Sequence, residues 1–412
     1  MEFRNQTLDN GLQVIAECNP NAYSSAFGFF VNTGSRDETD VISGVSHFLE
    51  HMVFKGTPKR TAADVNRELD EIGSQSNAYT SEEHTVYYAS VLPEFQANVV
   101  DLLGDIMRPS LRKEDFEVEK KVILEEIAKY EDQPPFGATD KCMAAHFVGH
   151  PLGRSVLGTA ESVTALTATQ MRDYFNQRYS PGNITLAASG KVDFDALVAQ
   201  AAKISADWQP FTVRRETPRA AARSAINVIE KAQAVQQYAV QIANGPAAMD
   251  EDRYACRLLA TVLGDDSGSR MFWELVDTGE AEYASIGTYE FQGTGIQMTF
   301  LCCAPEDCRA NLGRIHELQE SVEQNGITED ELERAKSKVC SSIVLRAERS
   351  ANRMFGVGSG WLQRREYTTV RESVDRYKAV TVADIVAVVE KHPYTTNTTV
   401  VVGPLTDLQP LG

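Results

Sequence analysis

Short runs of alternating or continuous apolar residues recur along the chain and predict β-strands. Each half of the chain opens with two such runs, GLQVIAE and SAFGFFVNTG in the first half and AINVIEK and QQYAVQIANG in the second. Longer segments with apolar positions three and four residues apart follow them and predict amphipathic helices. Strands mixed with paired helices indicate the α+β fold class: two homologous domains, each a mostly antiparallel sheet covered by helices on one face.

Two pairs of similar segments indicate that one domain occurs twice. A threonine that can cap a helix precedes an amphipathic segment and an asparagine that opens a strand, and the same sixteen-residue interval separates Thr167 from Asn183 and Thr381 from Asn397. The segments DFEVEKKVILEEI and ELERAKSKVCSSI repeat at a similar offset. A repeat of roughly 200 residues is too long for a solenoid unit and indicates a duplicated domain.

The boundary between the two domains is expected where the periodicity is lost. The segment from 208 to 225 contains two prolines and four arginines and has no clear period. We therefore predict an amino-terminal domain over residues 1–210, a linker over 211–224 and a homologous carboxy-terminal domain over 225–412.

Composition and charge exclude several classes of protein. The chain has 412 residues, and its net charge of −18 argues against binding to nucleic acid or to an anionic membrane surface. No apolar stretch approaches the roughly 18–20 residues of a membrane span, and the amino-terminal residues lack the basic start and apolar run of a signal peptide. Seven scattered cysteines are typical of reduced thiols. We therefore expect a cytoplasmic protein with neither a membrane nor a nucleic-acid partner.

The stretch HFLEHMVFKGT, which begins at His47, places two histidines and a glutamate among apolar residues. At helical spacing His47, Glu50 and His51 share one face. Two imidazoles four residues apart can bind one Zn²⁺, and the glutamate can take a proton from the water that the metal activates. The alternative is a helix with two polar contacts and a surface acid. Burial of these groups without a metal would be costly, which favours zinc.

A third zinc ligand is expected on the strongly helical segment that begins near residue 114. Glu119 and Glu126 lie seven residues apart, two turns along one face of that helix. Further carboxylates of the same segment compete with them: Glu117, Glu125 and Asp132. Composition alone favours a solvated acidic face with neighbouring lysines as partners, so the residues by themselves leave the third ligand open.

In combination these motifs resemble the pitrilysin and mitochondrial-processing-peptidase family of inverted-zincin metallopeptidases, whose reversed signature is H-x-x-E-H. The similarity extends over essentially the whole chain, from LDNGLQVI through GSQSNAYTSEEHTVYYA and HPLGRSVLGT to GDDSGSRMFWEL. This resemblance implies that His47, His51 and Glu126 bind one zinc ion and that Glu119 steadies these ligands. It also implies that Glu50 is the general base.

The resemblance further implies how peptide substrates bind. Asn77 and Ala78 would lie on a strand edge that receives the substrate as an added strand. Active relatives carry an arginine in the second half and a catalytic tyrosine seven residues later; here Tyr283 is kept, whereas Val276 stands at the arginine position. Relatives of this length pair into four-domain chambers, which implies a homodimer, or a heterodimer with a related subunit that supplies the missing arginine.

The sequence is therefore compatible with two alternative functions. The first is a zinc endopeptidase that hydrolyses unfolded peptides inside a chamber formed by a dimer, and the intact set of zinc-site residues favours it. The second is a partner-dependent or non-catalytic subunit of a heteromeric assembly, which Val276 favours. The second half has no H-x-x-E-H, and Ala335 and Ser342 align with Glu119 and Glu126, so we predict one metal per chain.

Overall fold

The computed structural model describes residues 1–408, which form two compact units with one β-sheet each. Unit 1 consists of three segments: Met1–Lys129, Arg154–Glu216 and Arg346–Thr368. Unit 2 consists of the remaining segments: Tyr130–Gly153, Thr217–Leu345 and 369–408. This arrangement of helices and mainly antiparallel sheets in two units confirms the predicted α+β fold class.

Unit 1 contains a six-stranded sheet with the order β1-β2-β6-β3-β5-β4. Its strands are β1 (Glu2–Thr7), β2 (Gln13–Cys18), β3 (Ser25–Val31), β4 (Gln75–Thr80), β5 (Thr85–Val91) and β6 (Ile184–Gly190). The pair β2 and β6 runs parallel, and the other pairs are antiparallel. Strand β4 is an edge strand, because its outer side pairs with no other strand of residues 1–408.

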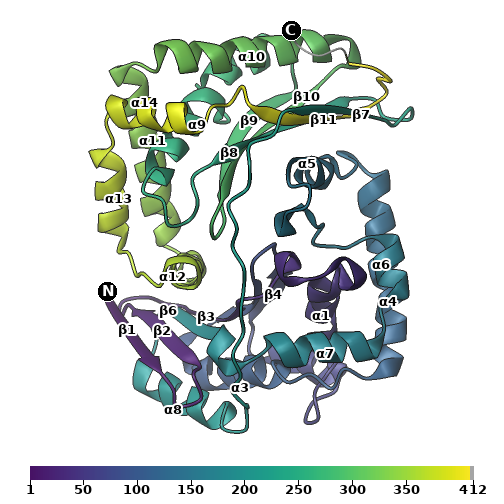
Figure 1. Cartoon of the computed structure of the whole chain (residues 1–412). Helices are drawn as coiled ribbons and strands as arrows, with labels where there is room; N and C mark the ends of the chain where they lie inside the picture. Colours follow the sequence, from purple (N-terminus) through teal and green to yellow (C-terminus); the bar gives the residue numbers. More distant parts are fainter. Residues whose placement is uncertain (409–412) are drawn as a thin grey trace. The chain divides into compact units, whose positions relative to one another are not determined.

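Helices cover both faces of this sheet. The helices of unit 1 are α1 (Val45–Val53), α2 (Ala62–Glu71), α3 (Gln96–Ile106), α4 (Lys113–Asp132, which begins in this unit), α6 (Ala160–Ala165), α7 (Ala168–Arg178), α8 (Phe194–Ile204) and α12 (Ser350–Arg364). Helices α3 and α8 pack on one face, while α12 packs against β2, β3 and β6 on the other (Figure 1).

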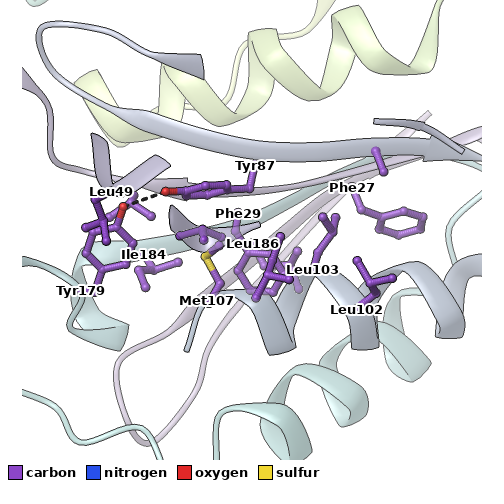
Figure 2. Close-up of a cluster of buried hydrophobic side chains, with 14 of the residues drawn as sticks. Phe27, Phe29, Leu49, Tyr87, Leu102, Leu103, Met107, Tyr179, Ile184 and Leu186 are labelled. Atoms are coloured by element: carbon purple, nitrogen blue, oxygen red, sulfur yellow. Dashed lines mark hydrogen bonds between the residues drawn. The ribbon is translucent and has the colours of Figure 1, made fainter. Parts of the chain in front are cut away.

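The sequence predicted helices on only one face of the sheet, and this is wrong for unit 1. Strand β3 shows the reason. Phe27 and Phe29 point into the larger core, which Leu49 of α1 also enters (Figure 2). Phe30 points the other way and packs with Met354 of α12. All residues of β3 are buried, because a strand covered on both sides needs apolar side chains at consecutive positions.

Unit 2 contains a five-stranded sheet with the order β7-β11-β8-β10-β9. Its strands are β7 (Ala225–Glu230), β8 (Gln237–Gly245), β9 (Tyr283–Glu290), β10 (Gly295–Cys303) and β11 (Asn397–Gly403). Its α-helices are α5 (Ala138–His146), α9 (Arg253–Gly264), α10 (Cys308–Asn325), α11 (Glu329–Ala347), α13 (Val370–Ala379) and α14 (Val382–Lys391). Within residues 1–408, no helix is both long and apolar enough to cross a membrane.

The two sheets share one topology, which supports the predicted duplication. The order β2-β6-β3-β5-β4 in unit 1 corresponds to β7-β11-β8-β10-β9 in unit 2, and in both the first pair is parallel. The repeated threonines act as predicted: Thr167 caps α7 and Thr381 caps α14, each through a capping box. Each helix then leads to the corresponding strand, β6 or β11.

Each half of the chain also contributes one helix to the sheet of the other half. Helix α12 comes late in the sequence but packs on the sheet of unit 1, where Arg353 donates a hydrogen bond to the buried Glu17 at 2.8 Å. Helix α5 comes early but packs on β8 and β11 of unit 2. The chain forms neither helix nor strand from 208 to 224, and the limits 1–210, 211–224 and 225–412 stay a prediction of the domain borders.

Candidate metal centre

Helix α1 presents the residues of the H-x-x-E-H motif on one side and apolar residues on the other. The helix follows Gly44, whose φ of 90° strains any residue with a side chain. The buried carboxyl group of Glu38 accepts hydrogen bonds from the backbone N–H groups of Gly44 and Ser46, both at 2.7 Å, and thereby pairs two N–H groups at the start of the helix. Phe48 and Leu49 are fully buried in the core, which fixes the rotation of the helix.

Two imidazoles of α1 and one carboxylate of α4 meet at one point. The Nε2 atoms of His47 and His51 each lie 3.8 Å from Oε2 of Glu126. The potential ligand atoms of the three residues all lie within 4.8 Å of one another. Glu126 is therefore the carboxylate of α4 that reaches both histidines. The competing carboxylates are exposed: Glu117, Glu125 and Asp132.

These three side chains fit a zinc ion. Two imidazole nitrogens and one carboxylate oxygen are ligands that Zn²⁺ prefers, and three protein ligands leave one position open, as in catalytic sites. In a tetrahedral site with bonds of about 2.0–2.1 Å the ligand atoms lie about 3.3 Å apart, which is close to the 3.8 Å found here. Burial lowers the pKa of His47 to about 4, and the neighbouring His51 adds to this shift, so His47 is neutral as metal binding requires.

Glu119 supports His51 from the side opposite to Glu126. Its Oε1 lies 2.9 Å from Nδ1 of His51, and its Oε2 lies 2.6 Å from Nζ of Lys55. Burial alone would raise the pKa of Glu119, but the hydrogen bonds from Lys55 and His51 outweigh it and hold this pKa below its usual value. The ionised Glu119 can only accept a hydrogen bond, so Nδ1 of His51 donates to it, and Nε2 is the ring nitrogen left to bind a metal.

Glu50 lies on the same stripe of α1 but binds neither histidine. Its Oε2 accepts a hydrogen bond from the hydroxyl of Thr80, the last residue of β4, at 2.5 Å. Burial raises the pKa of the Glu50 carboxyl, while the Thr80 hydroxyl opposes this shift. A carboxylate of raised pKa beside a set of metal ligands has the properties of a general base.

The predicted substrate-binding residues lie on the edge strand of unit 1. Asn77 is exposed and Ala78 is half-buried, and both belong to β4. Opposite them on the inner side of the pair stand Tyr88 and Tyr87 of β5, while the outer backbone groups of β4 face no other strand among residues 1–408. The same strand therefore contains Asn77, Ala78 and the donor to Glu50.

The predicted catalytic Tyr283 belongs to unit 2, whereas the candidate metal ligands belong to unit 1. It opens β9, the edge strand of its sheet, and its ring packs against Phe300 at a centroid distance of 5.7 Å. The side chain is partly exposed, with 43% of its surface accessible. Val276, at the expected arginine position, ends a π-helical turn (Phe272–Val276) and packs against the core.

Three residues of the centre were not predicted from the sequence: Lys55, Thr80 and Glu38. Lys55 and Thr80 both fall inside segments that carried the resemblance, MVFKGT and SNAYTSEEH, but nothing in their spacing indicates a partner on another element. Glu38 lies six residues before Gly44 in a stretch without regular period. A glutamate or aspartate shortly before a helix was the available signal for an amino-terminal cap.

This arrangement defines a class of protein: an inverted-zincin set of metal ligands on a duplicated α+β scaffold. A sequence profile described as "Insulinase (Peptidase family M16)" matches residues 13–160, and one described as "Peptidase M16 inactive domain" matches residues 165–339. An uncharacterised zinc protease of Mycobacterium bovis is 34% identical over 392 residues, which cover 93% of this chain and 89% of the relative. The chain belongs to peptidase family M16, which confirms the resemblance to the pitrilysin and processing-peptidase family.

Further relatives agree with this assignment. An uncharacterised zinc protease of Streptomyces coelicolor is 35% identical over 418 residues, covering 98% of this chain and 90% of the relative. A probable mitochondrial-processing peptidase subunit beta of Arabidopsis thaliana is 29% identical over 425 residues, covering 99% and 79%. The crystal structure of a protease from Helicobacter pylori has the same fold, with a TM-score of 0.90 at 22% identity over 98% of this chain and 99% of that one.

Proposed function

We propose that the chain is a zinc-dependent endopeptidase that hydrolyses unfolded peptides. One observation supports this proposal above all: His47, His51 and Glu126 converge around one point, and Glu50, which is not one of the candidate ligands, lies on the same helix as the two histidines. A binding or scaffolding protein has no need of a general base next to three metal ligands. Relatives named zinc protease are in keeping with this function.

The residues of unit 1 divide the chemistry among them. His47, His51 and Glu126 would hold the zinc ion, which when bound supplies a Lewis acid that polarises the scissile carbonyl and acidifies water. Glu50 takes the proton from the attacking water and passes it to the leaving amine. Thr80 would orient the Glu50 carboxylate through the hydrogen bond between its hydroxyl and Oε2.

Strand β4 offers a means of binding that does not depend on substrate sequence. Its unpaired edge, at Asn77 and Ala78, can accept an extended peptide as an additional strand through backbone hydrogen bonds. Only a segment without its own secondary structure can bind in this way. We therefore infer that unfolded peptides are the substrates and that folded proteins are not.

We further propose that the chain acts as a dimer. The Arabidopsis relative is named as a subunit of an assembly. By the resemblance described above, active relatives carry an arginine at the position of Val276. A related partner subunit could supply this arginine. A second candidate function, a partner-dependent subunit that is inactive alone, rests on this one substitution.

Metal analysis and a peptidase assay on the isolated chain test the proposal. We expect one zinc per chain, hydrolysis of a quenched fluorescent peptide, and loss of activity on chelation with recovery when zinc is added. Glu50→Gln should keep the zinc and lower kcat by about 10²–10⁴-fold, because the proton acceptor is removed. Full turnover by this variant would refute the role of Glu50, while a chain that binds zinc but is inactive without a partner would favour the second candidate.

A further inference from the structure

Lys55 lies directly behind the candidate metal centre, just after α1 ends at Val53. Its Nζ lies 2.6 Å from Oε2 of Glu119, whose Oε1 in turn lies 2.9 Å from Nδ1 of His51. Glu119 therefore contacts a lysine with one oxygen and a candidate ligand with the other. The side chain of Glu119 is only 6% exposed, and the ammonium group of Lys55 compensates its buried negative charge.

The backbone at Lys55 is anchored to the segment that leads into α4, the helix that carries Glu119. The guanidinium group of Arg112 donates to the carbonyl oxygen of Lys55 at 2.6 Å, and the N–H of Ser110 donates to the carbonyl oxygen of Gly56 at 3.0 Å. Gly56 has a φ of 106°, a conformation that turns the chain immediately after Lys55. These contacts keep the lysine between the end of α1 and the start of α4.

We propose that Lys55 is a positioning residue of the zinc centre: it holds one oxygen of Glu119 and so keeps the other oxygen directed at His51. This inference rests on the proposed function, because it assumes that His51 binds zinc through Nε2. Without a partner for Oε2, the Glu119 carboxylate can rotate about its terminal bond, which is soft. The orientation of the His51 ring would then lose its support, and zinc would bind less tightly.

A second effect of Lys55 acts in the opposite direction. The ammonium group is a cation near the metal, so its removal would also lower the repulsion felt by Zn²⁺. Glu119 compensates this charge by direct contact, and water screens the lysine side chain, which is 36% exposed. We therefore expect the loss of orientation to be the larger effect, and the sign of the change in zinc affinity decides between the two.

Zinc affinity of the full chain, measured by competition with a chromophoric chelator, tests the inference without any assay of activity. Removal of a group behind a metal ligand commonly weakens binding by about 10–100-fold, and we expect about tenfold for Lys55→Met because it acts through Glu119. Lys55→Arg keeps a cationic donor and should bind within about threefold of the unaltered chain. Lys59→Met is the matched control: it removes a lysine that is 75% exposed and makes the same change in net charge.

A double variant separates action through Glu119 from a general effect of charge. Lys55→Met should weaken zinc binding no further, within about twofold, when Glu119→Gln is already present, because coupled residues are not additive. Equal or tighter binding by Lys55→Met, or an additive loss in the double variant, would overturn the role of Lys55. Thermal unfolding of the metal-free proteins is compared first, to show that each variant folds. If Lys55→Met does not fold, Lys55→Gln replaces it, with the same expected loss of zinc affinity. Failure of the unaltered chain to bind zinc would overturn the proposed function and this inference together.

Discussion

Replacing Thr80 by valine would remove one hydroxyl and leave the shape of the side chain almost unchanged. The Oγ1 of Thr80 lies 2.5 Å from Oε2 of Glu50, and no other hydrogen bond reaches this carboxylate from residues 1–408. The variant therefore removes the hydrogen bond that orients the proposed general base. The proposed zinc ligands are untouched, so we expect the metal content to stay the same.

The structure sets the size of the effect. A hydrogen bond to a charged group contributes about 1.5–3 kcal/mol. Both side chains are half-buried, so water can replace part of the lost bond, and the lower part of that range applies, about 1.5–2 kcal/mol. If this free energy is lost only in the transition state, kcat falls by about 10–30-fold and KM is unchanged.

Steady-state hydrolysis of a quenched fluorescent peptide measures both constants. Thr80→Ser keeps a hydroxyl at the same position and should retain kcat within about threefold. Ser76→Ala is the control, because Ser76 is an exposed residue of the same strand and makes no hydrogen bond to Glu50. A kcat for Thr80→Val within about twofold of the unaltered chain, or a change in KM alone, would refute the reasoning.

Two further predictions address the ligands and the exchanged helix. Glu126→Ala should lower the zinc content well below one per chain, as measured by atomic emission of the purified protein; unchanged stoichiometry would assign the third ligand elsewhere. Gly358→Ala in α12 should destabilise unit 1 by about 1–3 kcal/mol in urea unfolding, because the new Cβ would lie 2.4 Å from the ring of Phe30. Gly356→Ala in the same helix is the control, since its Cβ would meet nothing closer than 3.8 Å, and it should stabilise by about 0.5–1 kcal/mol.

The grouping of the candidate metal ligands on one face of α1 could be predicted from the sequence because it depends only on local periodicity. His47 and His51 are one helical turn apart, so any α-helix over this segment brings their rings together, and the centroids lie 4.7 Å apart. Glu126 could not be chosen in this way. Its partner lies about 75 positions earlier, and only the packing of α4 on α1 separates it from its exposed neighbours.

The exchange of α5 and α12 shows what periodicity omits. An amphipathic helix indicates that one of its faces is buried, but not which sheet buries it. The signal for a second covered face was present in strand β3, whose residues SAFGFFV form a continuous run instead of an alternation. For the same reason Lys55 and Thr80 were missed, since each acts on a residue of another element.

The duplicated scaffold accounts for a candidate metal centre in only one of the two described units. Unit 2 keeps the strand order and the long helix α11, yet Ala335 aligns with Glu119 and is buried in an apolar core. Residues 1–408 contain one group of three side chains suited to a metal, and it is in unit 1. Buried carboxylates and imidazoles are costly unless a metal or an ion pair compensates them. In a domain copy that binds no metal, replacing the former ligand side chains by small or apolar ones stabilises the fold. Loss of one ligand therefore favours loss of the other ligands, while the fold persists.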